Sequence, residues 1–179
     1  DVEQAIAIYE DGVKAGVPGA YAGLAALYAN PAQAVFNETL GFEYAEKAAA
    51  ADDRRALYIL GECFREGRGT SVDPVKAVDA FVRAAELGLW DGADAAGDLL
   101  GNGREGLPAD PQRAASILDA ATERGSSVDQ KFRAGRVFLG GRYLPRDEER
   151  ARYWLEYAAE KGSEEARALL EAEFKPADA

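Results

Sequence analysis

Pairs of adjacent carboxylates are the residues in this sequence best suited to acid/base chemistry. They occur at Asp52-Asp53, Glu148-Glu149 and Glu164-Glu165. A glycosidase needs two carboxyl groups that are held across a cleft and whose pKa values are pushed apart. Each pair stands instead at the expected start of a helix, where the helix dipole favours negative charge. The pairs therefore indicate solvated helix starts, and we expect no catalytic residues in the chain.

A glycine pattern and the absence of histidine bear on cofactor and metal binding. Gly101-x-Gly103-x-x-Gly106 matches the dinucleotide-binding fingerprint letter by letter. That fingerprint binds pyrophosphate only between a strand and the N-terminus of a helix, and here it follows a helical pattern. The sequence also contains no histidine, the usual zinc ligand and general base. We therefore expect neither a cofactor nor a metal site.

Cys63 is the only cysteine, so no disulfide can form within the chain and the redox compartment cannot be inferred from bridges. It lies beside Leu60 and Phe64 on the apolar side of a predicted helix. A buried small hydrophobic side chain is the favoured interpretation, and a reactive thiol is the alternative.

A repeat organises the whole chain. The segment DPVKAVDAFVRAAELG, residues 73–88, has counterparts whose first residues are 36, 36, 37 and 37 positions apart: Asp1, Asn37, Asp73, Asp110 and Asp147. A fixed period of this length predicts a stacked helical solenoid that forms one continuous domain. The predicted units are residues 1–36, 37–72, 73–109, 110–146 and a truncated 147–179. Because the chain opens at a repeat start without methionine, we expect it to be a piece of a longer protein.

Each unit is predicted to begin with a capped helix. The Asp or Asn at its start can accept a hydrogen bond from a free amide of the first turn, and Pro74 and Pro111 suit the first helical position. Glycines that can adopt a positive φ are expected to end these helices: Gly16, Gly88, Gly125 and Gly162.

A second helix follows in each unit. It carries a central small residue with a large apolar residue three positions later, as in Ala25 with Tyr28 and Gly61 with Phe64. This pattern predicts two helices packed as a hairpin. The connectors after it contain glycine and arginine, which we interpret as a C-cap and a side chain facing the helix dipole: Gly67-Arg68, Gly103-Arg104 and Gly141-Arg142.

The charge of the chain indicates which classes of partner it can bind. The formal net charge of −11 argues against a nucleic-acid binder, which needs Lys and Arg to displace counterions from phosphates. No run of about 18 apolar residues occurs, so we predict no membrane span. Only the fourth unit, residues 110–146, is basic, with seven cations against four acids. This asymmetry is either an ordinary solvated face or a docking patch for an acidic partner.

Two segments carry a family resemblance. FEYAEKAAAADDRRALYILGECFREGRG and VDPVKAVDAFVRAAELG resemble Sel-one-like repeats, which are tetratricopeptide-like helical repeats. The resemblance extends over nearly the whole chain. It implies an all-α, right-handed solenoid of about five antiparallel helix-turn-helix repeats, whose first helices line a concave face. Cysteine-rich secreted relatives carry a disulfide in each repeat, and Cys63 alone departs from that subgroup.

The resemblance directs attention to side chains on the first helices that packing does not explain. If these helices line the concave face, the candidate partner-binding residues are Phe42, Glu43, Lys76, Asp79, Arg83, Ser116, Tyr153, Trp154 and Tyr157. The aromatic cluster stands out because Trp, Tyr and Arg dominate binding hot spots. Core packing is the favoured role of Trp154, whereas Tyr153 and Tyr157 are expected to be exposed. For Trp90, an exposed anchor and a cover for apolar neighbours stay open.

What the resemblance implies for function is a non-catalytic scaffold that holds a protein or peptide partner. Many similar proteins are bacterial and work outside the cytoplasm, in signalling, envelope assembly or exopolysaccharide export, so a periplasmic setting is expected and a cytoplasmic one is the alternative. Polysaccharide binding through stacked aromatic rings is the alternative function. The last unit leaves Phe174 and an apolar helix side without a successor, so we expect either that further repeats follow in the longer protein or that this end contacts another chain.

Overall fold

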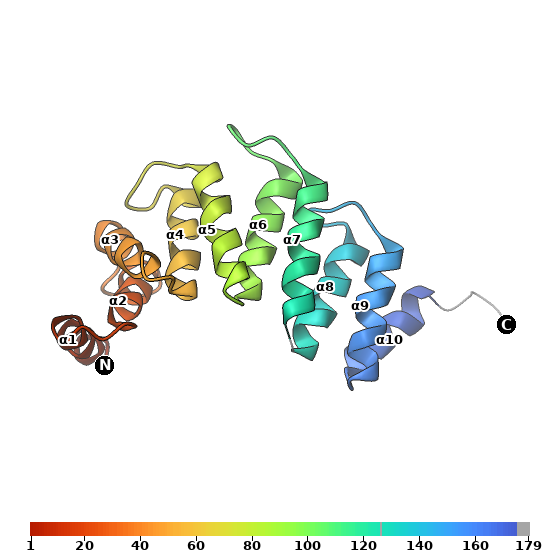
Figure 1. The fold of residues 1–179 in the computed structure, drawn as a ribbon, viewed down its shortest axis with the longest axis horizontal. Helices are drawn as coiled ribbons and strands as arrows, with labels where there is room; N and C mark the ends of the chain where they lie inside the picture. The colour runs from red at the N-terminus through yellow and green to blue at the C-terminus, as the bar shows by residue number, and fades with distance from the viewer. Residues whose placement is uncertain (126, 175–179) are drawn as a thin grey trace.

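The computed structural model describes residues 1–125 and 127–174, and in these residues the protein is a row of ten helices with no strand (Figure 1). The predicted all-α solenoid is confirmed. The helices are α1 (Val2–Lys14), α2 (Ala20–Tyr28), α3 (Glu38–Ala49), α4 (Arg54–Glu66), α5 (Pro74–Glu86), α6 (Trp90–Asn102), α7 (Pro111–Arg124), α8 (Val128–Gly140), α9 (Glu148–Glu160) and α10 (Glu164–Phe174).

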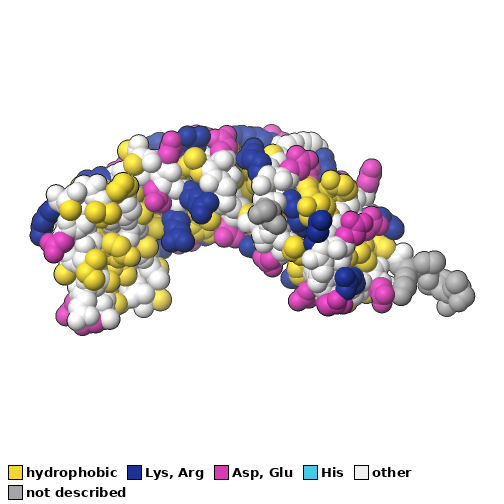
Figure 2. Space-filling model, turned by 60° about the horizontal axis from the view of Figure 1, so that its bottom comes forward, with side chains coloured by type: hydrophobic (Ala, Val, Ile, Leu, Met, Phe, Trp, Pro, Cys, Tyr) yellow, Lys and Arg dark blue, Asp and Glu magenta, His cyan; other side chains and the backbone are white. Residues whose placement is uncertain are grey.

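The helices form two layers of an arch. In Figure 1, α3, α5, α7 and α9 lie in front, and the even-numbered helices lie behind them. Turning the molecule shows that the side away from the front layer is hollowed (Figure 2). The even-numbered helices therefore line the concave face, and the odd-numbered helices form the convex face. Long connectors, residues 67–73, 103–110 and 141–147, lie along one edge of the arch (Figure 1).

The predicted N-caps of the odd-numbered helices are confirmed. The side chains of Asp1, Asn37, Asp73, Asp110 and Asp147 each accept a hydrogen bond from an amide of the first turn. Asp53 does the same for α4 and accepts from two amides, those of Arg55 and Ala56, both at 2.9 Å. These caps fix where each helix begins because they satisfy amides that have no partner within the helix.

Asp53→Ala is expected to lower the free energy of unfolding by about 1 kcal/mol, because it leaves two amides of α4 without their acceptor. Asp53→Asn keeps a side-chain oxygen at the same place and should lower the free energy of unfolding by only a few tenths of that amount. Urea titrations of the two variants measure the difference. Equal losses for alanine and asparagine would contradict the capping role.

The predicted C-cap glycines are confirmed except at one position. Gly16, Gly88 and Gly162 have φ of 72°, 87° and 102°, whereas Gly125 has φ of −69° and the prediction of a positive φ there is wrong. The backbone amide of Gly88 or Gly162 binds the carbonyl three residues earlier. In α7 the corresponding carbonyl, that of Thr122, accepts instead from the Nζ of Lys131. The amide of Gly125 donates instead to the carbonyl of Ala121 at 3.1 Å, and its backbone stays in the extended region.

Glycines and alanines allow the two layers to approach closely. A Cβ on Gly61 of α4 would stand 2.6 Å from the ring of Phe81, and one on Gly135 of α8 would stand 2.7 Å from Leu155. Both large partners are fully buried. The core is thus a line of large side chains from the convex layer that occupy the space left by small residues of the concave layer.

The same principle explains the dinucleotide-like glycine pattern. Gly101 lies within α6, and a Cβ there would overlap the backbone carbonyl of Tyr143. Gly103 and Gly106 follow the helix with φ of 67° and 79°, which bends the connector that leads to α7. All three glycines therefore have packing or turn roles.

Candidate interaction surface

All nine predicted partner-binding residues lie on α3, α5, α7 or α9, which form the convex layer. The expectation that these helices line the concave face is therefore corrected. The units predicted from the N-caps each begin with an odd-numbered helix, which belongs to the convex layer. The even-numbered helix of the concave layer comes second in each unit. Whether these residues bind a partner remains a prediction for the convex surface.

The aromatic cluster on α9 divides as expected. Tyr153 and Tyr157 are exposed, at 59% and 39%. Trp154 is buried, and its indole N–H donates to Asp119 of α7 at 3.0 Å. Burial raises the pKa of Asp119. Trp154 thus joins two outer helices, and its ring is not available for a ligand.

Most of the remaining predicted residues already contact other side chains or the backbone of the chain. Arg83 forms an ion pair with Asp52 at 2.8 Å and one with Glu86 at 3.1 Å. Lys76 lies over the ring of Phe64, and Phe42 packs edge-on against the same ring with 5.6 Å between centroids. Ser116 donates a hydrogen bond to a carbonyl of its own helix. Glu43 and Asp79 are simply exposed.

Two hollows lie between helices of the concave layer. The first, which we call the apolar pocket, has a volume of about 320 Å³ and lies between α2 and α4. Small and apolar side chains dominate its walls. Its lining residues are Ala26, Ala29, Asn30, Pro31, Tyr58, Ile59, Glu62, Cys63 and Arg68.

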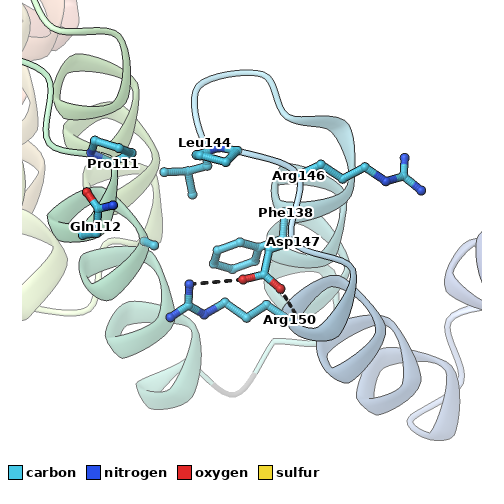
Figure 3. A pocket seen from close by; sticks show the side chains of 9 residues that line it. Pro111, Gln112, Phe138, Leu144, Arg146, Asp147 and Arg150 are labelled. Atoms are coloured by element: carbon cyan, nitrogen blue, oxygen red, sulfur yellow. Dashed lines mark hydrogen bonds and ion pairs between the residues drawn. The ribbon is translucent and has the colours of Figure 1, made fainter.

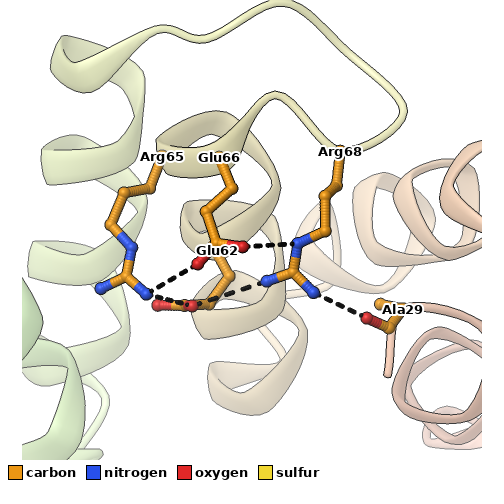
Figure 4. Close-up of polar contacts among 5 residues, drawn as sticks. All are labelled: Ala29, Glu62, Arg65, Glu66 and Arg68. Atoms are coloured by element: carbon orange, nitrogen blue, oxygen red, sulfur yellow. Dashed lines mark hydrogen bonds and ion pairs between the residues drawn. The ribbon is translucent and has the colours of Figure 1, made fainter. Parts of the chain in front are cut away.

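A four-residue ion-pair network forms the polar end of the apolar pocket (Figure 4). Glu62 pairs with Arg65 at 2.6 Å and with Arg68 at 3.6 Å, and Glu66 pairs with both arginines at 3.1 Å. Arg68 also donates to the carbonyl of Ala29 at 2.9 Å, so it caps the preceding inner helix α2. Burial raises the pKa of Glu62. The network joins two repeats through the contact of Arg68 with Ala29.

Cys63 lies at the floor of this pocket and is buried, as expected. Burial raises the pKa of its thiol to about 11. Because alkylation needs the thiolate, we expect it to be at least about tenfold slower in the folded protein than in urea. Equal rates in the two states, measured by mass spectrometry, would show that the thiol is accessible.

The second hollow, which we call the arginine pocket, has a volume of about 310 Å³ and lies between α6 and α8. Three arginines and one carboxylate line it, together with an apolar patch. The full lining is Trp90, Asp94, Arg133, Arg136, Val137, Gly140 and Arg142. Most of its charge comes from the basic fourth unit of the sequence.

Trp90 closes the inner wall of the arginine pocket. It is buried, and its indole N–H donates to the hydroxyl of Thr122 at 2.9 Å. The Thr122 hydroxyl in turn donates to the carbonyl of Leu118 at 2.6 Å. Of the two roles left open for Trp90, the cover for apolar neighbours is therefore the one that the structure shows. Lys131, also buried, caps the same helix end, and burial lowers its pKa.

Other hollows lie outside the concave layer. A cleft of about 170 Å³ near the starts of α7 and α9 is shown in Figure 3, where Arg150 pairs with Asp147 and Arg146 points away. A wider groove between α7 and α9 is lined mainly by acids and Tyr153. The cations at both places already have acidic partners. These cations therefore have fewer free N–H donors for a ligand than the arginines of the arginine pocket have.

The concave residues were missed from the sequence because the second helices were interpreted only as packing elements. One signal was available. Arg133 and Arg136 are three residues apart, so they share a helix face with Val137 and Gly140. Such a face in the basic fourth unit is polar enough to indicate an exposed surface, not a core.

Comparison with known proteins identifies the repeat. A family model of the Sel1 repeat matches residues 18–53, 54–89, 92–126 and 131–163, which is most of the chain. The chain belongs to the Sel1 repeat family. Each matched Sel1 segment pairs an even-numbered helix with the odd-numbered helix that follows it. The segments thus begin with the concave layer, half a repeat later than the predicted units.

Solved structures agree with a Sel1 solenoid. A Sel1 repeat protein from Oxalobacter formigenes is 26% identical, with a TM-score of 0.68 over 96% of this chain and 49% of that one. The protective antigen c5321 of uropathogenic Escherichia coli is 22% identical, with a TM-score of 0.63 over 92% and 35%. A putative Sel1 repeat protein from Klebsiella pneumoniae is 22% identical, with a TM-score of 0.54 over 95% and 84%. The chain thus spans about half the length of the first of these proteins.

Among curated proteins, none matches this Sel1 repeat chain. Within the described residues, no group of three or more metal-ligating side chains comes together. No helix in that part of the chain is long and apolar enough to cross a membrane.

Proposed function

We propose that this chain is a non-catalytic scaffold that binds a partner protein through an extended segment laid along its concave face. Sel1 repeats generally mediate protein interactions. The observation that carries the proposal is the pair of open hollows on one face, the apolar pocket and the arginine pocket. Half-buried apolar side chains there, Tyr58, Ile59 and Val137, have a water-exposed side that a partner can cover.

Selection from a phage-displayed dodecapeptide library tests this proposal. We expect peptides that bind the parent chain and fail to bind Ala26→Glu, which places a charged side chain in the apolar pocket. Ala26 is exposed, so the larger side chain does not crowd the core. Ala7→Glu makes the same change at an exposed position of α1 and should bind normally. A library that yields no specific binder, or binders lost equally in both variants, would contradict the proposal.

Polysaccharide binding stays the alternative prediction. Its candidate stacking surface is reduced to Tyr153 and Tyr157, because Trp154 is buried. Specific signals on a glycan array that disappear in a Tyr153→Ala, Tyr157→Ala variant would favour it.

For the setting, we propose an extracytoplasmic role in envelope assembly, signalling or exopolysaccharide export. What supports this is the likeness to bacterial Sel1 repeat proteins. Fractionation of cells that express the full-length protein tests the compartment, and recovery in the cytoplasm would overturn it.

A further inference from the structure

The arginine pocket contains one guanidinium that is already fixed in place. Arg133 forms an ion pair with Asp91 of α6 at 2.9 Å, and its guanidinium carbon lies 4.2 Å from the ring centre of Trp90. Its side chain is still 39% exposed. A planar guanidinium held by an acid and by a ring loses little further freedom when it binds a ligand. The remaining N–H groups are therefore preorganised donors.

Two other arginines of the pocket form weaker ion pairs or none. Arg136 contacts the ring of Phe132, and no acid of the described chain pairs with it. Arg142 reaches Asp98 only at 3.7 Å, and 66% of its side chain is exposed. The single carboxylate of the lining, Asp94, already accepts the hydroxyl of Tyr143 at 2.7 Å. Asp91, Asp94 and Asp98 thus balance the three arginines in formal charge, and Arg136 is the guanidinium of the pocket that has no acidic partner among the described residues.

We infer that the arginine pocket binds the carboxylate of an Asp or Glu residue in an extended partner peptide. This inference rests on the proposed function and names the chemistry of the partner. Guanidinium groups bind carboxylates in a bidentate manner, and Val137 with Gly140 provides an apolar shelf beside them. Asp91 and Asp98 border the pocket, so a polyanion such as nucleic acid is repelled where an isolated acidic side chain fits.

The position of the two pockets sets a spacing for the peptide. The apolar pocket lies between α2 and α4, and the arginine pocket lies two inner helices further along. With about 10 Å per packed helix, the separation is about 20 Å, which an extended chain spans with about six residues. The partner therefore carries an apolar residue and an acidic residue about six positions apart.

The dodecapeptide selection described above tests this chemistry. We expect the selected sequences to be enriched in Asp or Glu at a fixed distance from an apolar residue. Peptides that bind without such enrichment would overturn the acidic-peptide inference and leave the scaffold proposal intact. If no peptide is selected, the scaffold proposal fails, and this inference fails with it.

Fluorescence anisotropy with a selected peptide then tests the pocket itself. Arg136→Gln should weaken binding about tenfold, and higher salt should reduce the difference. Arg113→Gln removes the same charge from exposed α7 on the convex face and should bind like the parent. Circular dichroism checks that both variants are folded. Equal affinities for the two variants would show that the pocket does not bind a peptide carboxylate.

Discussion

Phe81→Ala is expected to lower the free energy of unfolding by about 3–5 kcal/mol, the usual cost of a cavity left by a deleted core ring. Phe81 is fully buried at the centre of the row of helices. It packs against the ring of Tyr58, with 5.3 Å between centroids, and fills the space left by Gly61. Gly61 has no side chain that could fill the cavity from the α4 side.

The unfolding transition of Phe81→Ala should also lose cooperativity. Each repeat of a solenoid is stabilised only by its neighbours, so a weak middle unit uncouples the two ends. Trp90 and Trp154 are the only tryptophans, and they lie in α6 and α9, the side of the row that follows Phe81. Tryptophan fluorescence and circular dichroism should therefore give different midpoints in urea. Val75→Ala, at an exposed position of the same helix, is the control and should change stability by less than about 0.5 kcal/mol.

Gly101→Ala is the second substitution with a large expected effect, about 3 kcal/mol. The new methyl group would overlap the backbone carbonyl of Tyr143, which belongs to the connector between α8 and α9. A backbone atom cannot move aside as the end of a flexible side chain can. The change is therefore expected to push α6 away from that connector and to weaken the wall of the arginine pocket.

Gly140→Ala supplies the matched control for Gly101→Ala. Gly140 is a helical glycine of α8, and a methyl group added to it would have no heavy atom within 4 Å, apart from its own helix backbone and its two chain neighbours. Alanine there should be neutral or stabilising by about 0.5–1 kcal/mol, because it reduces the freedom of the unfolded chain. Thermal melts of both variants provide the comparison. Similar losses at the two positions would show that contact with Tyr143 is not the cause.

Much of the fold could be predicted because its signals are local. Asp73, Asp110 and Asp147 cap helices through amides only three residues away, and their spacing reveals the repeat. The central small residues likewise indicate where the layers approach. Gly125 could not be predicted in the same way, because the nearby carbonyl of Thr122 accepts from Lys131, a side chain of the next helix.

The candidate site was harder to predict than the fold. Whether Tyr58 or Tyr153 faces the hollow depends on the direction in which the stack of repeats curves, which no single repeat encodes. The exposure of Tyr153 was correctly predicted, but its layer was not. The basic fourth unit was visible as a charge count, and only the structure shows that Arg133, Arg136 and Arg142 line one pocket.

Photo-crosslinking can establish whether a partner segment lies on the concave face. A photoreactive phenylalanine analogue would replace either Tyr58, on the wall of the apolar pocket, or Tyr153, exposed on the convex face. The two changes are matched aromatic replacements. With a selected peptide bound, we predict a covalent adduct from position 58 and none from position 153. An adduct from position 153 alone would place the binding surface on the convex layer and contradict the proposed concave-face scaffold.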